Sequence, residues 1–172
     1  MTAESLNVKA GVAPEAILLL GSNMGRRVQQ IRDAVKALSL ETRIRAISPM
    51  YATEPYGCAR QPWFLNLAVR IETPLSPWEL LALAKRLEAD AGRLPTERWG
   101  PRRLDVDIIL MGKTVVSEQG LIVPHESMRL RRFCLTPVAD IAPEAGVPPG
   151  EETVEQLLAA CKDTLSVVRL SL

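Results

Sequence analysis

The sequence predicts an α+β fold whose core is an antiparallel sheet. Short apolar runs of strand length are interspersed with longer segments in which apolar residues recur every three or four positions. These segments follow one another in the order β-α-β-β-α-β, with additions at the C-terminal end. Hydrophobic residues make up 47% of the 172-residue chain, which is sufficient for the core of one domain.

The first half of the chain contains three predicted strands and one helix. Residues 16–20 are apolar and predict a buried strand, which ends in a turn of small residues, GSNMG. Apolar residues at helical spacing predict an amphipathic helix over residues 26–40. Alternating apolar residues predict a second strand over residues 43–51, and residues 64–71 predict a third. Between these strands, residues 53–63 form a loop that is long enough to be functional.

The second half begins with a helix that has signals at both ends. Ser76 is the expected N-cap, Pro77 takes the first helical position, and Gly92 provides the C-cap. A strand that begins at Asp105 follows. The remaining predicted elements are a short strand at residues 114–116, a helix at 153–161 and a final strand at 165–170. This order is that of the ferredoxin-like split βαβ fold, an antiparallel sheet with helices on one face.

The composition limits the class of protein and the cellular compartment in which we expect it. The formal net charge of +1 argues against nucleic-acid binding through phosphate neutralisation. No apolar run approaches the ~20 residues that a membrane span needs, so we expect a cytoplasmic protein without a membrane partner. We also expect a monomer with one domain over residues 1–172, of which residues 1–14 are a loose tail. The separated cysteines are expected to be reduced thiols: Cys58, Cys134 and Cys161.

The segment ERWGPRRLDVDIILMG contains the residues most suited to chemistry. Asp105 and Asp107 are two positions apart on a strand, so their carboxylates point to one face, about 7 Å apart. Arg102 and Arg103 immediately precede them. An Mg²⁺ ion that holds a phosphate chain suits this arrangement, because carboxylates bind the metal and guanidinium groups bind phosphate. A solvated strand edge is the alternative, and the apolar run at residues 108–110 argues against it.

Aromatic residues next to loops suggest a second kind of binding site. Tyr56, Trp99 and Phe133 flank loops, and converging loop aromatics would make a stacking slot for a flat ring. Asn66, on the predicted strand after the first of these loops, would offer such a ring both a donor and an acceptor. His125 follows a proline in a loop, where a histidine on its own is more often structural than catalytic.

Several sequence motifs occur in a fixed order along the chain. The most specific is the block RWGPRRLDVDI, which begins at Arg98. The supporting motifs are GSN at residues 21–23, Y-x-T-x-P at 51–55, QPWFLN at 61–66 and VPH at 123–125. Together, over about residues 17 to 143, they resemble the 6-hydroxymethyl-7,8-dihydropterin pyrophosphokinase family of folate biosynthesis.

This resemblance implies a reaction and a role for each matching residue. The family transfers the pyrophosphoryl group of ATP to the hydroxyl of 6-hydroxymethyl-7,8-dihydropterin and leaves AMP. Asp105 and Asp107 match the ligands of two Mg²⁺ ions, and Arg93 and Arg102 match catalytic arginines that bind the triphosphate. The positions matching ATP-binding residues are Glu88, Arg98, Arg102, His125 and Arg131. The positions matching pterin-binding residues are Thr53, Pro55, Tyr56, Phe64, Asn66, Trp99 and Phe133.

Two other functions are compatible with parts of this pattern. Ferredoxin-like sheets often bind RNA through exposed aromatic residues, but the strand pattern of such aromatics is missing here. An Mg²⁺-dependent nuclease would use the same pair of aspartates. Release of AMP that depends on a hydroxymethylpterin distinguishes the kinase from both.

Overall fold

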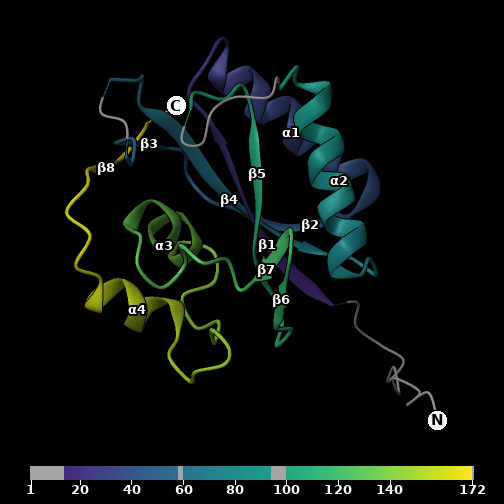
Figure 1. Ribbon diagram of the computed structural model, residues 1–172, viewed down its shortest axis with the longest axis vertical. Helices are drawn as coiled ribbons and strands as arrows, with labels where there is room; N and C mark the ends of the chain where they lie inside the picture. Colours follow the sequence, from purple (N-terminus) through teal and green to yellow (C-terminus); the bar gives the residue numbers. More distant parts are fainter. Residues whose placement is uncertain (1–13, 58–59, 94–99, 172) are drawn as a thin grey trace.

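The computed structural model describes residues 14–57, 60–93 and 100–171. Within these ranges the chain forms a six-stranded sheet, a separate two-stranded hairpin and four helices (Figure 1). The elements are β1 (Glu15–Ser22), α1 (Arg27–Glu41), β2 (Arg43–Ile47), β3 (Tyr51–Thr53), β4 (Phe64–Glu72), α2 (Pro77–Asp90), β5 (Asp105–Met111), β6 (Val116–Glu118), β7 (Leu121–Val123), α3 (Arg132–Ala139), α4 (Val154–Ala160) and β8 (Val167–Arg169).

The large sheet is antiparallel throughout, with strand order β5-β1-β4-β3-β8. Strand β2 also pairs with β4, beyond the end of β3. Strand β1 lies inside the sheet, between β5 and β4, and nearly all of its residues are buried because helices cover both faces of the sheet. Alternate residues of β1 therefore enter two different cores: Leu18 and Leu20 enter one, and Ile17 and Leu19 enter the other.

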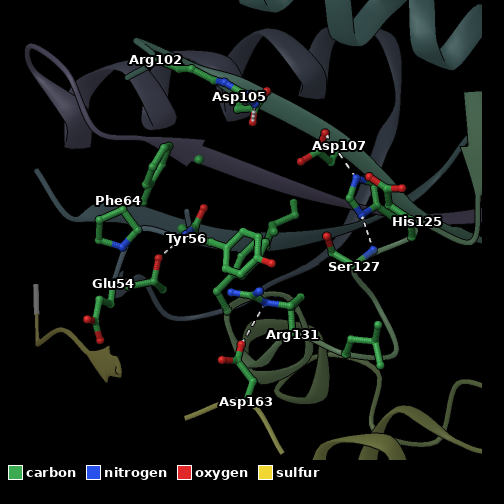
Figure 2. Close-up of a pocket in the computed structure, with 18 of the residues that line it drawn as sticks. Glu54, Tyr56, Phe64, Arg102, Asp105, Asp107, His125, Ser127, Arg131 and Asp163 are labelled. Atoms are coloured by element: carbon green, nitrogen blue, oxygen red, sulfur yellow. Dashed lines mark hydrogen bonds and ion pairs between the residues drawn. The ribbon is translucent and has the colours of Figure 1, made fainter. Parts of the chain in front are cut away.

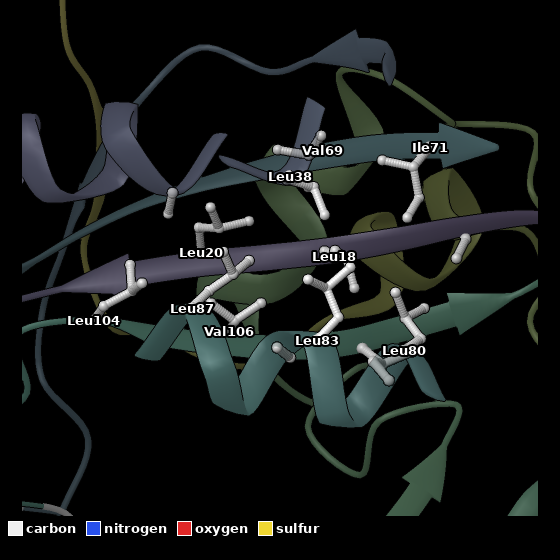
Figure 3. Close-up of a cluster of buried hydrophobic side chains, with 14 of the residues drawn as sticks. Leu18, Leu20, Leu38, Val69, Ile71, Leu80, Leu83, Leu87, Leu104 and Val106 are labelled. Atoms are coloured by element: carbon white, nitrogen blue, oxygen red, sulfur yellow. The ribbon is translucent and has the colours of Figure 1, made fainter. Parts of the chain in front are cut away.

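Helices α1 and α2 pack on one face of the sheet, as the predicted fold requires. Leu38 of α1 and Leu80 and Leu83 of α2 contact a layer of strand residues that includes Leu18 and Ile71 (Figure 3). The capping box at the start of α2 confirms Ser76 as its N-cap. No helix in the described ranges is both long enough and apolar enough to cross a membrane.

Helices α3 and α4 cover the other face, which the predicted core left open. Cys134, Leu135 and Val138 of α3 pack against Ile17 and Ile109 of the sheet. The chain then returns through β8 to the edge of the sheet, where it pairs with β3. No element was predicted over the residues of α3. Strand β7 was not predicted either, and it pairs with β6.

The prediction of one strand over residues 43–51 was wrong, because the chain forms two strands there. Pro49 interrupts the pairing, since proline has no backbone N–H to donate. At the interruption, Ser48 N donates to Ala68 O at 2.9 Å. The Ser48 hydroxyl accepts from Ala68 N, also at 2.9 Å. The break lets β3 continue along β4 toward the end of the sheet at which the polar residues gather.

Candidate active site

A cavity of about 750 Å³ lies on the α3 side of the sheet (Figure 2). Its floor is a row of residues that are paired across neighbouring strands. Asp105 of β5 pairs with Gly21 of β1, and Gly21 pairs on its other side with Asn66 of β4. In the next row, Phe64 of β4 pairs with Thr53 of β3. The antiparallel register thus brings the acidic segment and the amide and aromatic residues to one cavity.

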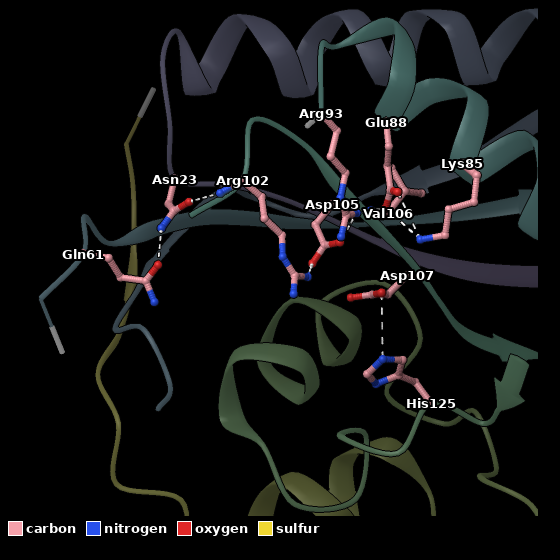
Figure 4. A network of polar contacts seen from close by, with 10 residues as sticks. All are labelled: Asn23, Gln61, Lys85, Glu88, Arg93, Arg102, Asp105, Val106, Asp107 and His125. Carbon is pink, nitrogen blue, oxygen red and sulfur yellow. Dashed lines mark hydrogen bonds and ion pairs between the residues drawn. The ribbon is translucent and has the colours of Figure 1, made fainter. Parts of the chain in front are cut away.

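Arginines hold the first carboxylate at one end of the cavity. Asp105 Oδ1 accepts a hydrogen bond from Arg93 Nη1 at 2.6 Å, and Asp105 Oδ2 accepts one from Arg102 Nη1 (Figure 4). Only 16% of the Asp105 side chain is exposed, so the two guanidinium groups balance a charge that is largely removed from water. Arg102 also lines the cavity.

Asp107 lies on the same face of β5 as Asp105, but its carboxylate has fewer cationic partners than that of Asp105 in the part of the chain that the structure describes. Burial, followed by the charges of Asp105 and Glu88, raises the pKa of Asp107 to about 7. Among the described residues, its ion-pair contact is with His125, whose Nε2 is 3.9 Å from Asp107 Oδ1. Asp105 and Asp107 present carboxylate oxygens on the same face of β5. Mg²⁺ prefers such oxygen ligands, so the donors present here fit that metal.

His125 presents a hydrogen-bond donor to the cavity. Its Nδ1 accepts from Ser127 N at 3.1 Å, which assigns the proton of the neutral ring to Nε2. Burial lowers the pKa of His125, so the neutral form is favoured. Its backbone N donates to Ile109 O at 3.0 Å and thereby fixes the loop against β5. The ring therefore directs an N–H group toward Asp107.

Glu88, on α2, is not one of the described residues that line the cavity. Its carboxylate is buried between α2 and β5 and accepts from Val106 N at 2.9 Å. Lys85 Nζ lies 3.0 Å from the other oxygen, and Arg93 forms a further ion pair (Figure 4). In this position Glu88 orients the guanidinium group of Arg93, which also contacts Asp105. Of the other nucleotide-side positions, His125 and Arg131 line the cavity, and Arg98 falls outside the described residues.

The predicted pterin-side residues that the structure describes all line the same cavity. They are Thr53, Pro55, Tyr56, Phe64, Asn66 and Phe133. Trp99 lies outside the described residues. Asn66 is buried and donates through Nδ2 to Thr53 Oγ1 at 2.7 Å, which fixes the orientation of its amide. A Cβ atom on Gly21 would lie 2.5 Å from Asn66 Oδ1, so only glycine leaves room for this amide.

Several residues at this site were not predicted from the sequence. Buried Asn23 joins three segments: its Nδ2 donates to Gln61 Oε1 at 3.0 Å, and its Oδ1 accepts from Arg102 N at 2.7 Å (Figure 4). The GSN turn was one of the motifs that support the family resemblance, but it gave no sign of these partners. Glu54 and Asp163 also line the cavity, and the sequence marked neither of them.

Paired carboxylates and arginines that share a cavity with an amide and aromatic rings are features of an enzyme that transfers a phosphate-containing group. Comparisons with known proteins identify which kind. The model of the 7,8-dihydro-6-hydroxymethylpterin-pyrophosphokinase family matches residues 17–143. The chain belongs to this family.

Curated relatives agree with this assignment. The 2-amino-4-hydroxy-6-hydroxymethyldihydropteridine pyrophosphokinase of Pseudomonas aeruginosa is 43% identical over 144 residues, which cover 83% of this chain and 88% of the relative. A protein of the same name from Methylorubrum extorquens is 42% identical, with 84% and 91% of the two chains covered. The resemblance drawn from the motifs is therefore confirmed.

A solved structure supports the fold. The crystal structure of Plasmodium falciparum HPPK-DHPS wild type superposes with a TM-score of 0.64 at 16% identity. The match covers 86% of this chain but 43% of the other, so this chain spans less than half the length of that protein. At this identity the comparison concerns the fold alone. It confirms the predicted ferredoxin-like class.

Proposed function

We propose that this chain transfers the pyrophosphoryl group of ATP to the hydroxymethyl group of 6-hydroxymethyl-7,8-dihydropterin in the cavity described above. The products are AMP and the pterin diphosphate, an intermediate of tetrahydrofolate biosynthesis. The observation that carries the proposal is the row Asp105–Gly21–Asn66, in which a carboxylate and a buried amide lie on either side of a glycine at the floor of one cavity. A cavity of about 750 Å³ is within the range of small-molecule sites.

At the acidic end, the chain binds the triphosphate through positive and polar groups. Arg93, Arg102 and Arg131 offer guanidinium forks, and the Nε2–H of His125 offers a neutral donor. In the structure Arg93 and Arg102 are bound to Asp105, and the triphosphate provides them with a more highly charged acceptor. Their role in the transition state is to neutralise charge on the transferred group.

Asp105 and Asp107 are the residues that would hold two Mg²⁺ ions. When bound, the metal supplies neutralisation of phosphate charge and lowers the pKa of the attacking hydroxyl. Deprotonation of Asp107, whose pKa is raised to about 7, is needed before it can act as a ligand. We therefore expect metal affinity to rise with pH up to about pH 7 and then to level off.

At the other end, the chain orients the pterin so that its hydroxymethyl group faces the triphosphate. Asn66 has a fixed amide that hydrogen-bonds polar atoms of the ring edge, while Phe64 and Phe133 offer aromatic faces. In the reaction the hydroxyl oxygen bonds to the β-phosphorus, and the bond from that phosphorus to the α–β bridging oxygen breaks. AMP departs with the bridging oxygen, and the hydroxyl proton passes to solvent. Positioning of the two substrates provides much of the rate.

The test is to measure AMP formation from ATP and Mg²⁺ with and without 6-hydroxymethyl-7,8-dihydropterin. We expect AMP only when the pterin is present, and a fall of at least about a thousandfold in Asp107→Asn. Asp33→Asn, a change in an exposed residue of α1, is the matched control and should behave as the wild type. AMP release without pterin, or near-normal turnover by Asp107→Asn, would overturn the assignment. Cleavage of an oligonucleotide would favour a nuclease instead.

A further inference from the structure

We propose that Asp163, from the C-terminal segment, is a positioning residue that holds the Arg131 guanidinium in place at the wall of the active-site cavity. The inference rests on the proposed function, since Arg131 is one of the groups assigned to the triphosphate. It goes beyond it, because Asp163 lies outside residues 17–143, the part of the chain that the family model matches. Asp163 is nevertheless one of the residues that line the cavity.

The contact between the two side chains is direct and shielded. Arg131 Nε lies 3.1 Å from Asp163 Oδ2, and the exposed fractions of the two side chains are 15% and 9% (Figure 2). The guanidinium carbon of Arg131 also lies 3.6 Å from the centre of the Tyr56 ring. Arg131 is therefore held from two directions, by a carboxylate and by an aromatic face.

The Asp163 carboxylate is itself fixed by hydrogen bonds from the backbone. Its Oδ2 accepts from Arg132 N at 3.1 Å, and its Oδ1 accepts from Leu165 N at 3.1 Å. Two backbone donors thus set the orientation of the carboxylate. Because both oxygens have defined partners, the carboxylate acts as a rigid support for Arg131.

The segment that carries Asp163 contacts both the loop of Arg131 and the loop of Tyr56, the two residues whose side chains stack. On one side, Cys161 Sγ lies 3.5 Å from Leu130 O, next to Arg131 in the chain. On the other side, Ser166 exchanges two hydrogen bonds with Glu54: Glu54 N donates to Ser166 O at 3.0 Å, and Ser166 N donates to Glu54 Oε2 at 3.1 Å. The C-terminal segment therefore sets the distance between the Arg131 loop and the Tyr56 loop.

Arg131 retains hydrogen-bonding capacity in this position. Among the described residues, its buried Nε and Nη2 have no hydrogen-bond partner, although Nε is ion-paired with Asp163. Buried donors without acceptors are uncommon in folded proteins. The pairing with Asp163 thus keeps the arginine oriented without using all of its donors.

The experiment is a double-mutant cycle on Asp163→Asn and Arg131→Ala, measured with the full chain. The two readouts are the KM for ATP with pterin present and the affinity for a non-hydrolysable ATP analogue with Mg²⁺. We expect Asp163→Asn to raise the KM for ATP and weaken analogue binding by about tenfold, with a smaller change in kcat. In the Arg131→Ala background, Asp163→Asn should produce no further change in either readout.

Glu152→Gln is the matched control. Glu152 also lies in the C-terminal part of the chain and pairs with Arg129 at 3.1 Å, but neither residue lines the cavity. Thermal unfolding of every variant measures the loss of stability that each substitution causes. The loss of stability caused by Asp163→Asn should remain in the Arg131→Ala background. Equal effects of Asp163→Asn in both backgrounds, or no effect in either, would overturn the proposal.

The binding readout separates this proposal from the proposed function. If the wild-type chain makes no pterin-dependent AMP, the proposed function fails, and the cycle is then decided by analogue affinity alone. Coupled losses of affinity would still support positioning of Arg131 by Asp163. Additive losses would reject it even if the enzyme turns over normally.

Discussion

Replacing Asp107 by asparagine is expected to stabilise the metal-free protein while it removes catalysis. Burial, and then the charges of Asp105 and Glu88, raises the pKa of Asp107 from 3.8 to about 7. A carboxyl group with a raised pKa binds more protons in the folded state than in the unfolded state, so its ionisation costs stability. Asparagine has the shape of the neutral acid and no charge, so the substitution removes that cost.

The magnitude follows from the pKa shift. One pKa unit corresponds to about 1.4 kcal/mol, so a rise from 3.8 to about 7 gives a ceiling of about 4 kcal/mol. Because 31% of the side chain is exposed, water screens part of the penalty, and we expect about 1–3 kcal/mol at about pH 8. The cost grows as the pH rises from 3.8 to about 7 and is constant above that range. At about pH 5 the gain should therefore be less than half as large.

Urea unfolding in the presence of a chelator measures this effect. The free energies of unfolding of wild type and Asp107→Asn are compared at about pH 5 and about pH 8, with Asp33→Asn as an exposed control. The expected result is a more stable Asp107→Asn protein whose advantage increases with pH. A variant that is less stable than wild type at the higher pH would refute the reasoning, as would a gain that does not depend on pH.

Three further substitutions test separate parts of the structure. Gly21→Ala should raise the KM for the pterin about tenfold but not that for ATP, because the new Cβ would displace Asn66, whose Oδ1 lies 2.5 Å from its position. Equal increases in both KM values would contradict this reasoning. Tyr51→Phe removes the 2.5 Å hydrogen bond to Asp140 and should lower the free energy of unfolding by about 1–3 kcal/mol, an effect that an unchanged urea midpoint would exclude. Ser76→Ala removes the N-cap of α2 and should cost about 1 kcal/mol with kcat unchanged, whereas a loss of kcat would connect the start of α2 to the site.

Local patterns were sufficient to predict much of the core fold and the acidic part of the site. Side chains two positions apart on a strand share a face whatever surrounds them, so Asp105 and Asp107 could be placed together without a structure. The start of α2 was equally predictable, since a capping box depends on residues three apart. These features depend on backbone geometry over a few residues.

Features that depend on contacts between distant residues could not be predicted. Asp163 contacts Arg131 only because β8 returns to pair with β3, and nothing in its sequence neighbourhood indicates that path. Pro49 marks the break between β2 and β3, but the sequence does not show that the Ser48 hydroxyl accepts the N–H of Ala68 there, twenty residues away. Glu88 matched a nucleotide-side position, but the sequence could not show that its partners would be Arg93 and the backbone of β5.

The sheet itself sets the separation between the two ends of the site. Asp105, Gly21 and Asn66 occupy one row on β5, β1 and β4, and neighbouring strands are about 4.8 Å apart. The acidic residue and the amide are thus about 10 Å apart at the backbone. The central residue of the row has no side chain, which leaves open the floor between them. A Cβ at that position would lie 2.5 Å from Asn66 Oδ1 and displace the amide, so the glycine is needed to hold the pterin end of the site in place while the acidic end stays unchanged.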